Sequence, residues 1–204
     1  MAIGDNYITM QELKDYMSIQ GAAYDARITS VVSAVSREVE SWCNRQFNLA
    51  SAPSARVYDL TDIDTVIVDD FSTTAGLIVQ SDINDDGLYY QTWTAGDYTL
   101  RPLNGVRNGI AGFPYWVIEA TGSQLRFKNT RRPHVKVTAQ WGWTSVPDPV
   151  HEACLMLGAD TFQLKDSRLG IAGSDQFGTV VRVRDSVVVQ SRLKHYVRGS
   201  VYVK

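Results

Sequence analysis

Apolar residues recur every three or four positions through the first fifty residues, which is the period of an amphipathic helix. The spacing predicts a short helix over 10–18 and a longer helix over 24–43. The apolar stripe of the longer helix consists of Ile28, Val31, Val32, Val35, Val39 and Trp42. Thr9 precedes Glu12 by three residues, which predicts a capping box at the start of the first helix. Gly21 is expected to end that helix.

The hydrophobic period changes to two after residue 54. Seven short segments rich in β-branched and aromatic residues follow, separated by clusters of Gly, Asn, Asp or Pro. They are ARVYDL, TVIVDDF, GLIVQS, DYTLRPL, YWVIEA, QLRF and HVKVTAQWGW. This pattern predicts a compact antiparallel β region. In the last segment, Trp141 and Trp143 share one strand face with Val135 and Val137.

A third helix is expected to begin at Asp148 and Pro149, because Asp caps free N–H groups and Pro fits the first helical turn. Its apolar stripe is Val150, Ala153, Cys154, Leu157, Thr161 and Leu164. The glycine-rich stretch GIAGSDQFG over 170–178 predicts a loop or hairpin tip, followed by a strand TVVRVR and a last helix over 185–197.

The order of these elements predicts an α+β fold, in which a helical core of about four helices is interrupted by an inserted antiparallel β subdomain. The expected boundaries are 1–54 for the N-terminal helical part, 55–145 for the β subdomain and 146–204 for the C-terminal helical part. Apolar residues make up 44% of the chain and charged residues 21%, which is typical of globular proteins. The sequence contains no apolar run of membrane-spanning length and no signal-peptide pattern, so we expect a cytosolic protein without membrane contact.

Charge is distributed unevenly. Residues 55–130 hold ten acidic and five basic side chains, whereas residues 165–204 hold three acidic and eight basic ones. The C-terminal part is therefore expected to meet an acidic partner. The candidate partner-binding residues are Leu169, Ile171, Phe177, Arg182, Arg184, Arg192, Lys194 and Arg198. A nucleic-acid patch and an ordinary solvated face remain alternatives. Aromatic residues do not alternate with these charges, so the pattern is weak evidence for base stacking.

The stretch DINDDG resembles the first half of a calcium loop, with Asp82, Asn84 and Asp86 at alternate positions and Gly87 at the turn. The twelfth position is Trp93 instead of the bidentate Glu that such a loop needs. The sequence therefore favours an acidic turn, with calcium binding weak or absent.

Catalytic and cofactor signatures are missing from the sequence. Cys43 and Cys154 fall in apolar helical patterns and are expected to be reduced core residues. The three histidines, His134, His151 and His195, have no metal-ligand or triad spacing and are expected to be structural or surface residues. We therefore expect no enzymatic activity, no cofactor and no tightly bound transition metal.

Three stretches together resemble the head-tail connector, or adaptor, family of long-tailed double-stranded DNA phages. The first is the capped helix YITMQELKDYM, and the second is the helix RITSVVSAVSREVESWCNRQF. In the third, GWTSVPDPVHEACLMLGADTFQLKDS, a Trp-Gly-Trp strand passes through prolines into a helix. The closing VVVQSRLKHYVR is similar to the last helix of that family.

The resemblance implies a structural virion protein that forms a ring, commonly of twelve subunits, at the head-tail junction. Its partners would be the portal protein and a downstream neck or tail-completion protein. Double-stranded DNA would pass through the ring without sequence recognition. The protein would be located in the virion neck, and in the host cytoplasm during assembly.

Two alternatives follow from the same sequence. The first is another virion component, such as a tail-completion or decoration protein. The second is a β-rich module that binds glycans or calcium through Tyr89, Tyr90, Trp93 and the Asp82 loop.

Overall fold

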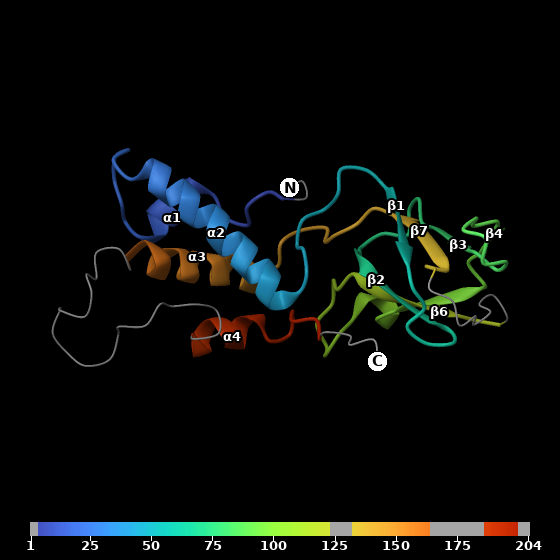
Figure 1. Ribbon diagram of the computed structural model, residues 1–204. Helices are drawn as coiled ribbons and strands as arrows, with labels where there is room; N and C mark the ends of the chain where they lie inside the picture. Colours follow the sequence, from blue (N-terminus) through green and yellow to red (C-terminus); the bar gives the residue numbers. More distant parts are fainter. Residues whose placement is uncertain (1–3, 123–131, 164–185, 200–204) are drawn as a thin grey trace. The chain divides into compact units, whose positions relative to one another are not determined.

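The computed structural model describes residues 4–122, 132–163 and 186–199. These residues form two compact units, a helical unit within Gly4–Phe47 and 146–199 and a β unit within Asn48–Ser145. Figure 1 shows the helices and the strands of both units. Four α-helices and two antiparallel sheets are present in the described part of the chain. The predicted α+β class is confirmed.

The helical unit contains α1 (Met10–Tyr16), α2 (Asp25–Cys43), α3 (Asp148–Gln163) and α4 (Val187–Leu193). α3 packs against each of the other three helices, and α1 also packs against α2 (Figure 1). The predicted stripe of α2 is buried from Ile28 to Val39, whereas Trp42 at its end is 36% exposed. Trp42 is therefore not part of the core.

The predicted capping box at α1 is confirmed. Thr9 Oγ1 accepts a hydrogen bond from the Glu12 N–H at 3.1 Å, and the Glu12 carboxylate accepts one from the Thr9 N–H at 2.6 Å. The helix ends earlier than expected, because Ser18 instead of Gly21 adopts the first left-handed conformation, with φ of 57°. The Ile19 N–H then donates to the Lys14 carbonyl at 2.9 Å, which satisfies an end carbonyl of the helix.

The third and fourth helices differ from the prediction in their buried faces and lengths. α3 buries a wider face than one stripe, because α1, α2 and α4 contact it from different sides. Phe162 is buried near its end, whereas the predicted Thr161 is only half-buried. α4 stops at Leu193, and a turn follows in which Tyr196 becomes buried and packs edge-on against Phe47.

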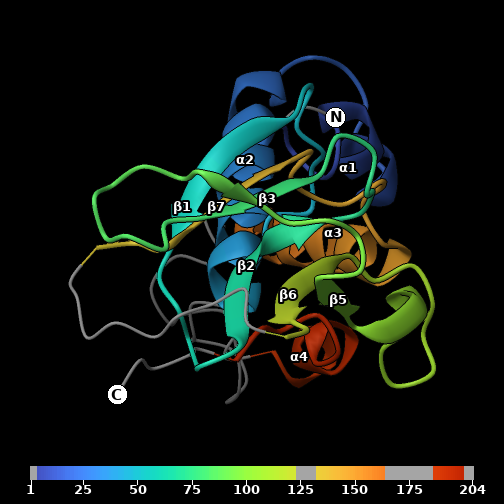
Figure 2. The same ribbon diagram turned by 90° about the vertical axis from the view of Figure 1, so that its right-hand side faces the viewer.

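The β unit contains two antiparallel sheets, and in Figure 2 strands β1, β7 and β3 of one sheet lie above strands β2, β6 and β5 of the other. One sheet has the order β1 (Ser54–Tyr58), β7 (Val135–Ala139), β3 (Ile78–Ser81) and β4 (Gln91–Thr92). The other sheet has the order β2 (Thr65–Phe71), β6 (Tyr115–Ala120) and β5 (Tyr98–Arg101), and a short 3-10 turn, η1 (Leu103–Gly105), follows β5. The sequence analysis missed β4, because two residues are too few to show a period.

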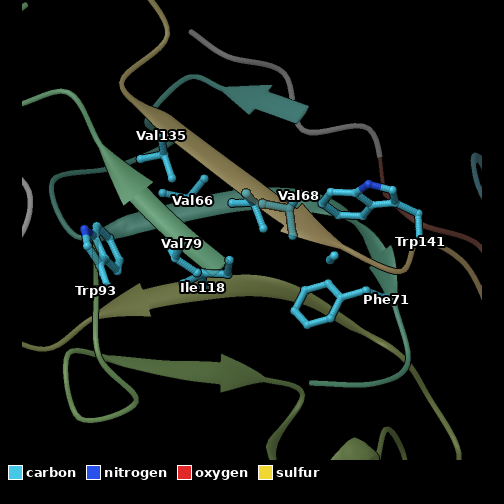
Figure 3. Packing of buried hydrophobic residues seen from close by; sticks show 10 residues of the cluster. Val66, Val68, Phe71, Val79, Trp93, Ile118, Val135 and Trp141 are labelled. Atoms are coloured by element: carbon cyan, nitrogen blue, oxygen red, sulfur yellow. The ribbon is translucent and has the colours of Figure 1, made fainter. Parts of the chain in front are cut away.

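The core of the β unit is built from both sheets, as Figure 3 shows. Val66, Val68 and Phe71 of β2 and Ile118 of β6 meet residues of the other sheet there. Those residues are Val79, Val135, Val137 and Ala139. The alternation predicted for β7 is confirmed, since Val135, Val137 and Ala139 are fully buried. Trp141 continues this face and contacts the Phe71 ring edge-on.

The two ends of the β unit are hydrogen-bonded to each other. The Ala50 N–H donates to the Trp141 carbonyl at 2.7 Å, and the Trp143 N–H donates to the Asn48 carbonyl at 3.2 Å. Gly142 lies between them with φ of +107°, where an added Cβ would come within 1.7 Å of the Asn48 carbonyl oxygen. The chain therefore enters and leaves the β unit where these two hydrogen-bonded stretches meet. Only glycine fits at position 142.

Two predicted strands, over 124–127 and 179–184, lie outside the described residues, as does the predicted loop over 170–178.

Candidate interaction surfaces

Buried polar side chains connect segments within each unit. The Tyr7 hydroxyl donates to the Glu40 carboxylate and accepts a hydrogen bond from the Phe47 N–H. It therefore connects the chain before α1 to α2 and to the residues that follow α2. Trp143 Nε1 donates to the Asp70 carboxylate at 2.9 Å in a buried site of the β unit. In the part of the chain that the structure describes, no group of three or more His, Cys, Asp or Glu residues could hold a metal ion.

Cys43 and Cys154 are buried free thiols, as predicted. Burial raises the pKa of each thiol to about 12. Thiolate is the reactive form of cysteine, so neither residue is suited to nucleophilic chemistry at neutral pH.

Two of the three histidines, His134 and His151, lie beside carboxylates of their own unit. Buried His134 lies with Nε2 4.0 Å from Asp85 in the β unit. His151 on α3 lies with Nε2 3.3 Å from Glu12 on α1. The Thr9 N–H and, less strongly, His151 lower the pKa of Glu12. These contacts join neighbouring elements of one unit.

The Asp82 loop is an acidic turn whose first carboxylate is bound by its own backbone. Asp82 Oδ1 accepts N–H bonds from Asn84, Asp85 and Asp86, and Oδ2 accepts one from Gly87 at 2.7 Å. Burial alone would raise the pKa of Asp82, but these N–H groups outweigh it and lower the pKa. The lone pairs that calcium would need on Asp82 are thus already occupied.

Trp93, which the glycan-binding alternative requires at the surface, is only 5% exposed. Its Nε1 donates to Ser81 Oγ at 3.0 Å, and its ring belongs to the β core. This burial counts against an aromatic glycan-binding surface at Trp93.

Of the predicted partner-binding residues, Arg192, Lys194 and Arg198 lie in the described part of the chain. The other five, Leu169, Ile171, Phe177, Arg182 and Arg184, lie outside the described residues. Arg192 and Lys194 are exposed on and just after α4, and Arg192 lies 3.8 Å from Glu152 of α3. Val187 is 80% exposed and Val188 54%, so α4 presents apolar and basic side chains to its surroundings. We call Val187, Val188, Arg192 and Lys194 the α4 face.

A second surface, which sequence reasoning missed, lies on the β unit. The loop over 59–64 carries exposed Ile63 among Asp59, Asp62 and Asp64, and the loop over 82–90 carries exposed Asp86, Leu88 and Tyr90. We call these seven residues the β tip. The acidic excess of 55–130 was a signal for it, but the sequence alone did not show that the two loops leave the sheet at the same end.

No helix in the described ranges is long and apolar enough to cross a membrane.

Comparison with solved structures finds the same fold in a particle neck. A chain from the neck of an empty GTA particle, computed with C6 symmetry, is 19% identical, with a TM-score of 0.55. The similarity covers 97% of this chain and 94% of that chain. A chain from the neck of a native GTA particle, computed with C12 symmetry, is 16% identical over 100% of both chains, with a TM-score of 0.45. No protein-family model and no curated protein matches this chain.

Proposed function

We propose that this chain is a structural protein of a virion neck, where it forms a homo-oligomeric ring between the portal and the tail. The observation that carries the proposal is the fold shared with a particle-neck chain over 97% of this chain and 94% of that chain. The similarity extends over both units, so the β insertion belongs to the shared fold. Ring size is a further part of the proposal, and rings of six or twelve subunits both obey the C6 symmetry used for that neck.

The described residues support a structural role over an enzymatic one. Their buried titratable groups are engaged in packing contacts, as with Tyr7 and Asp70. The two free thiols have raised pKa values and are buried.

The basic C-terminal part is proposed as a docking surface for an acidic protein surface of the neck. Complementary charge would speed the encounter and fix the orientation of the partners, while the exposed valines of the α4 face would supply apolar contact. DNA would pass through the ring without sequence recognition, and the docking surface would face protein.

A tail-completion or decoration protein is the second candidate, because such a protein could also be built on this fold. The glycan or calcium module is not favoured, since Trp93 is buried and Asp82 is bound by its own loop.

The test is genetic complementation of the virus that encodes the chain. Particles that lack the protein should accumulate as filled heads without tails, and the wild-type chain should restore joining. The quadruple variant Arg182→Ser, Arg184→Ser, Arg192→Ser and Arg198→Ser should fail to restore it. Arg101→Ser, which removes one basic side chain from the Arg101–Glu119 pair of the β unit, is a control for the loss of a single positive charge. Normal infectious yield without the chain would contradict the proposal.

A further inference from the structure

Large apolar side chains are exposed among carboxylates at the β tip. Ile63 and Tyr90 are each 65% exposed and Leu88 is 50% exposed. Exposed apolar side chains bordered by charged ones are typical of protein–protein contacts, in which the apolar groups supply contact area and the charges orient the partner. The acidic side chains that accompany them are Asp59, Asp62, Asp64 and Asp86.

The strand register brings the two loops of the β tip to one end of the sheet. β1 ends at Tyr58 and β3 ends at Ser81, and both residues pair with Val135 at the start of β7. The loops over 59–64 and 82–90 therefore leave the sheet at the same level. The pKa of Tyr89 supports their closeness, since burial raises it and the charges of Asp82 and Asp59, one from each loop, raise it further.

The α4 face has the same mixture of side chains with the opposite charge. Val187 and Val188 are exposed at 80% and 54%, and exposed Arg192 and Lys194 follow within two turns. Val189 and Leu193 are buried and hold α4 in the helical unit, so the exposed side chains are presented on a fixed helix. Arg192 lies 3.8 Å from the Glu152 carboxylate of α3, which is long for an ion pair.

We propose that the β tip of one copy of this chain binds the α4 face of a second copy. The occupant is a second copy because the same chain carries both complementary surfaces, apolar and acidic on one unit and apolar and basic on the other. A contact between two different surfaces of identical chains is head-to-tail, and its repetition closes into a ring when the rotation permits. The inference rests on the proposed neck function and gives the ring its subunit contact.

Charge reversal on each surface tests this contact. Asp59→Lys with Asp64→Lys replaces two of the four carboxylates of the β tip and takes its net charge from −4 to 0. The described hydrogen bond of the Asp64 carboxylate is to the Thr65 hydroxyl, so its replacement frees no backbone N–H. Arg192→Glu with Lys194→Glu reverses the α4 face. Sedimentation velocity at low salt should give a dissociation constant at least tenfold weaker for either double variant than for the wild type. In this contact Asp59 and Asp64 are placed opposite Arg192 and Lys194. The chain that carries all four changes should therefore recover association, because these residue pairs again have opposite charges.

A mixture of the two double variants gives a sharper result. Each double variant keeps one intact surface, and the two intact surfaces belong to different chains. At a concentration where each variant alone is monomeric, the mixture should therefore form one-to-one dimers and no larger species. If the contact instead joined the same surface of two copies, the mixture would not form dimers that contain one chain of each variant.

Two controls separate this contact from general charge effects and from misfolding. Asp5→Lys with Asp15→Lys changes two exposed carboxylates of the helical unit by the same charge and should leave association unchanged. Ile63→Ser should weaken association, whereas Leu103→Ser, on an exposed leucine just after β5, should not. Thermal unfolding of each variant shows whether it is folded.

Three outcomes overturn the inference. A wild-type chain that is monomeric at low salt up to about 100 μM contradicts the contact but leaves the neck function open, because a portal could still assemble the ring. Failure of the four-change variant to associate, with its fold intact, also contradicts the contact. If the α4 variant associates like the wild type and loses only portal binding, the α4 face binds the portal instead.

Discussion

Among the glycines that the structure describes, Gly142 has the least room for a side chain. Its φ of +107° disfavours any other residue, and an added Cβ would come 1.7 Å from the Asn48 carbonyl oxygen, a backbone atom. We expect Gly142→Ala to destabilise the protein by about 3 kcal/mol or more, because the paired ends of the β unit must separate. Urea unfolding measures this loss.

Gly96→Ala is the matched control for Gly142. Gly96 has no positive φ, and an added Cβ would meet no atom within 4 Å. We expect its free energy of unfolding to stay within about 0.5 kcal/mol of the wild type. An equal loss in the free energy of unfolding for the two variants would show that the close backbone contact at Gly142 is not the cause of the loss.

Asp82 links the stability of the β unit to pH. Its pKa is lower in the folded chain than in the unfolded chain, so its contribution is present above about pH 4 and is lost as pH falls through the folded pKa. We expect Asp82→Asn to be less stable than the wild type at pH 7 and to lose less stability between pH 5 and pH 2.5. Urea unfolding at several pH values measures how the free energy of unfolding of each protein depends on pH. The same pH dependence in the wild type and in Asp82→Asn would contradict this role.

At the scale of elements, the first turn of α1 depends on its cap. Thr9 Oγ1 accepts the Glu12 N–H at 3.1 Å, and Thr9→Ala would leave that N–H without its side-chain partner. We expect a loss of about 1 kcal/mol in the free energy of unfolding. Thr9→Ser keeps the hydroxyl and should retain most of the stability, whereas an equal loss in both variants would point to the threonine methyl group instead.

The sequence predicted elements whose buried residues follow one clear period, such as α2 from Ile28 to Val39 and β7 from Val135 to Ala139. It missed features that depend on contacts between distant segments. β4 is too short to have a period, and α3 buries a wide face because three helices surround it. The β tip was missed for a related reason, since its two loops are brought together only when β1 and β3 both pair with β7.

The whole molecule is expected to consist of two parts that can be separated. The ends of the β unit pair with each other at Leu49 and Gly142, and its two sheets enclose their own core. We expect a fragment of residues 46–146 to fold alone and to unfold cooperatively. The fluorescence of its buried tryptophans, Trp93, Trp141 and Trp143, should shift to the red on unfolding. A fragment without a cooperative transition would show that the helical unit is needed to fold it.

Ring formation in the neck is the central claim, and electron cryomicroscopy of the chain mixed with its portal tests it most directly. We predict a ring of this chain, of six or twelve subunits, stacked coaxially on the portal with an open central channel. Portals that stay bare beside unassembled chain, at micromolar concentrations of both proteins and low salt, would contradict it.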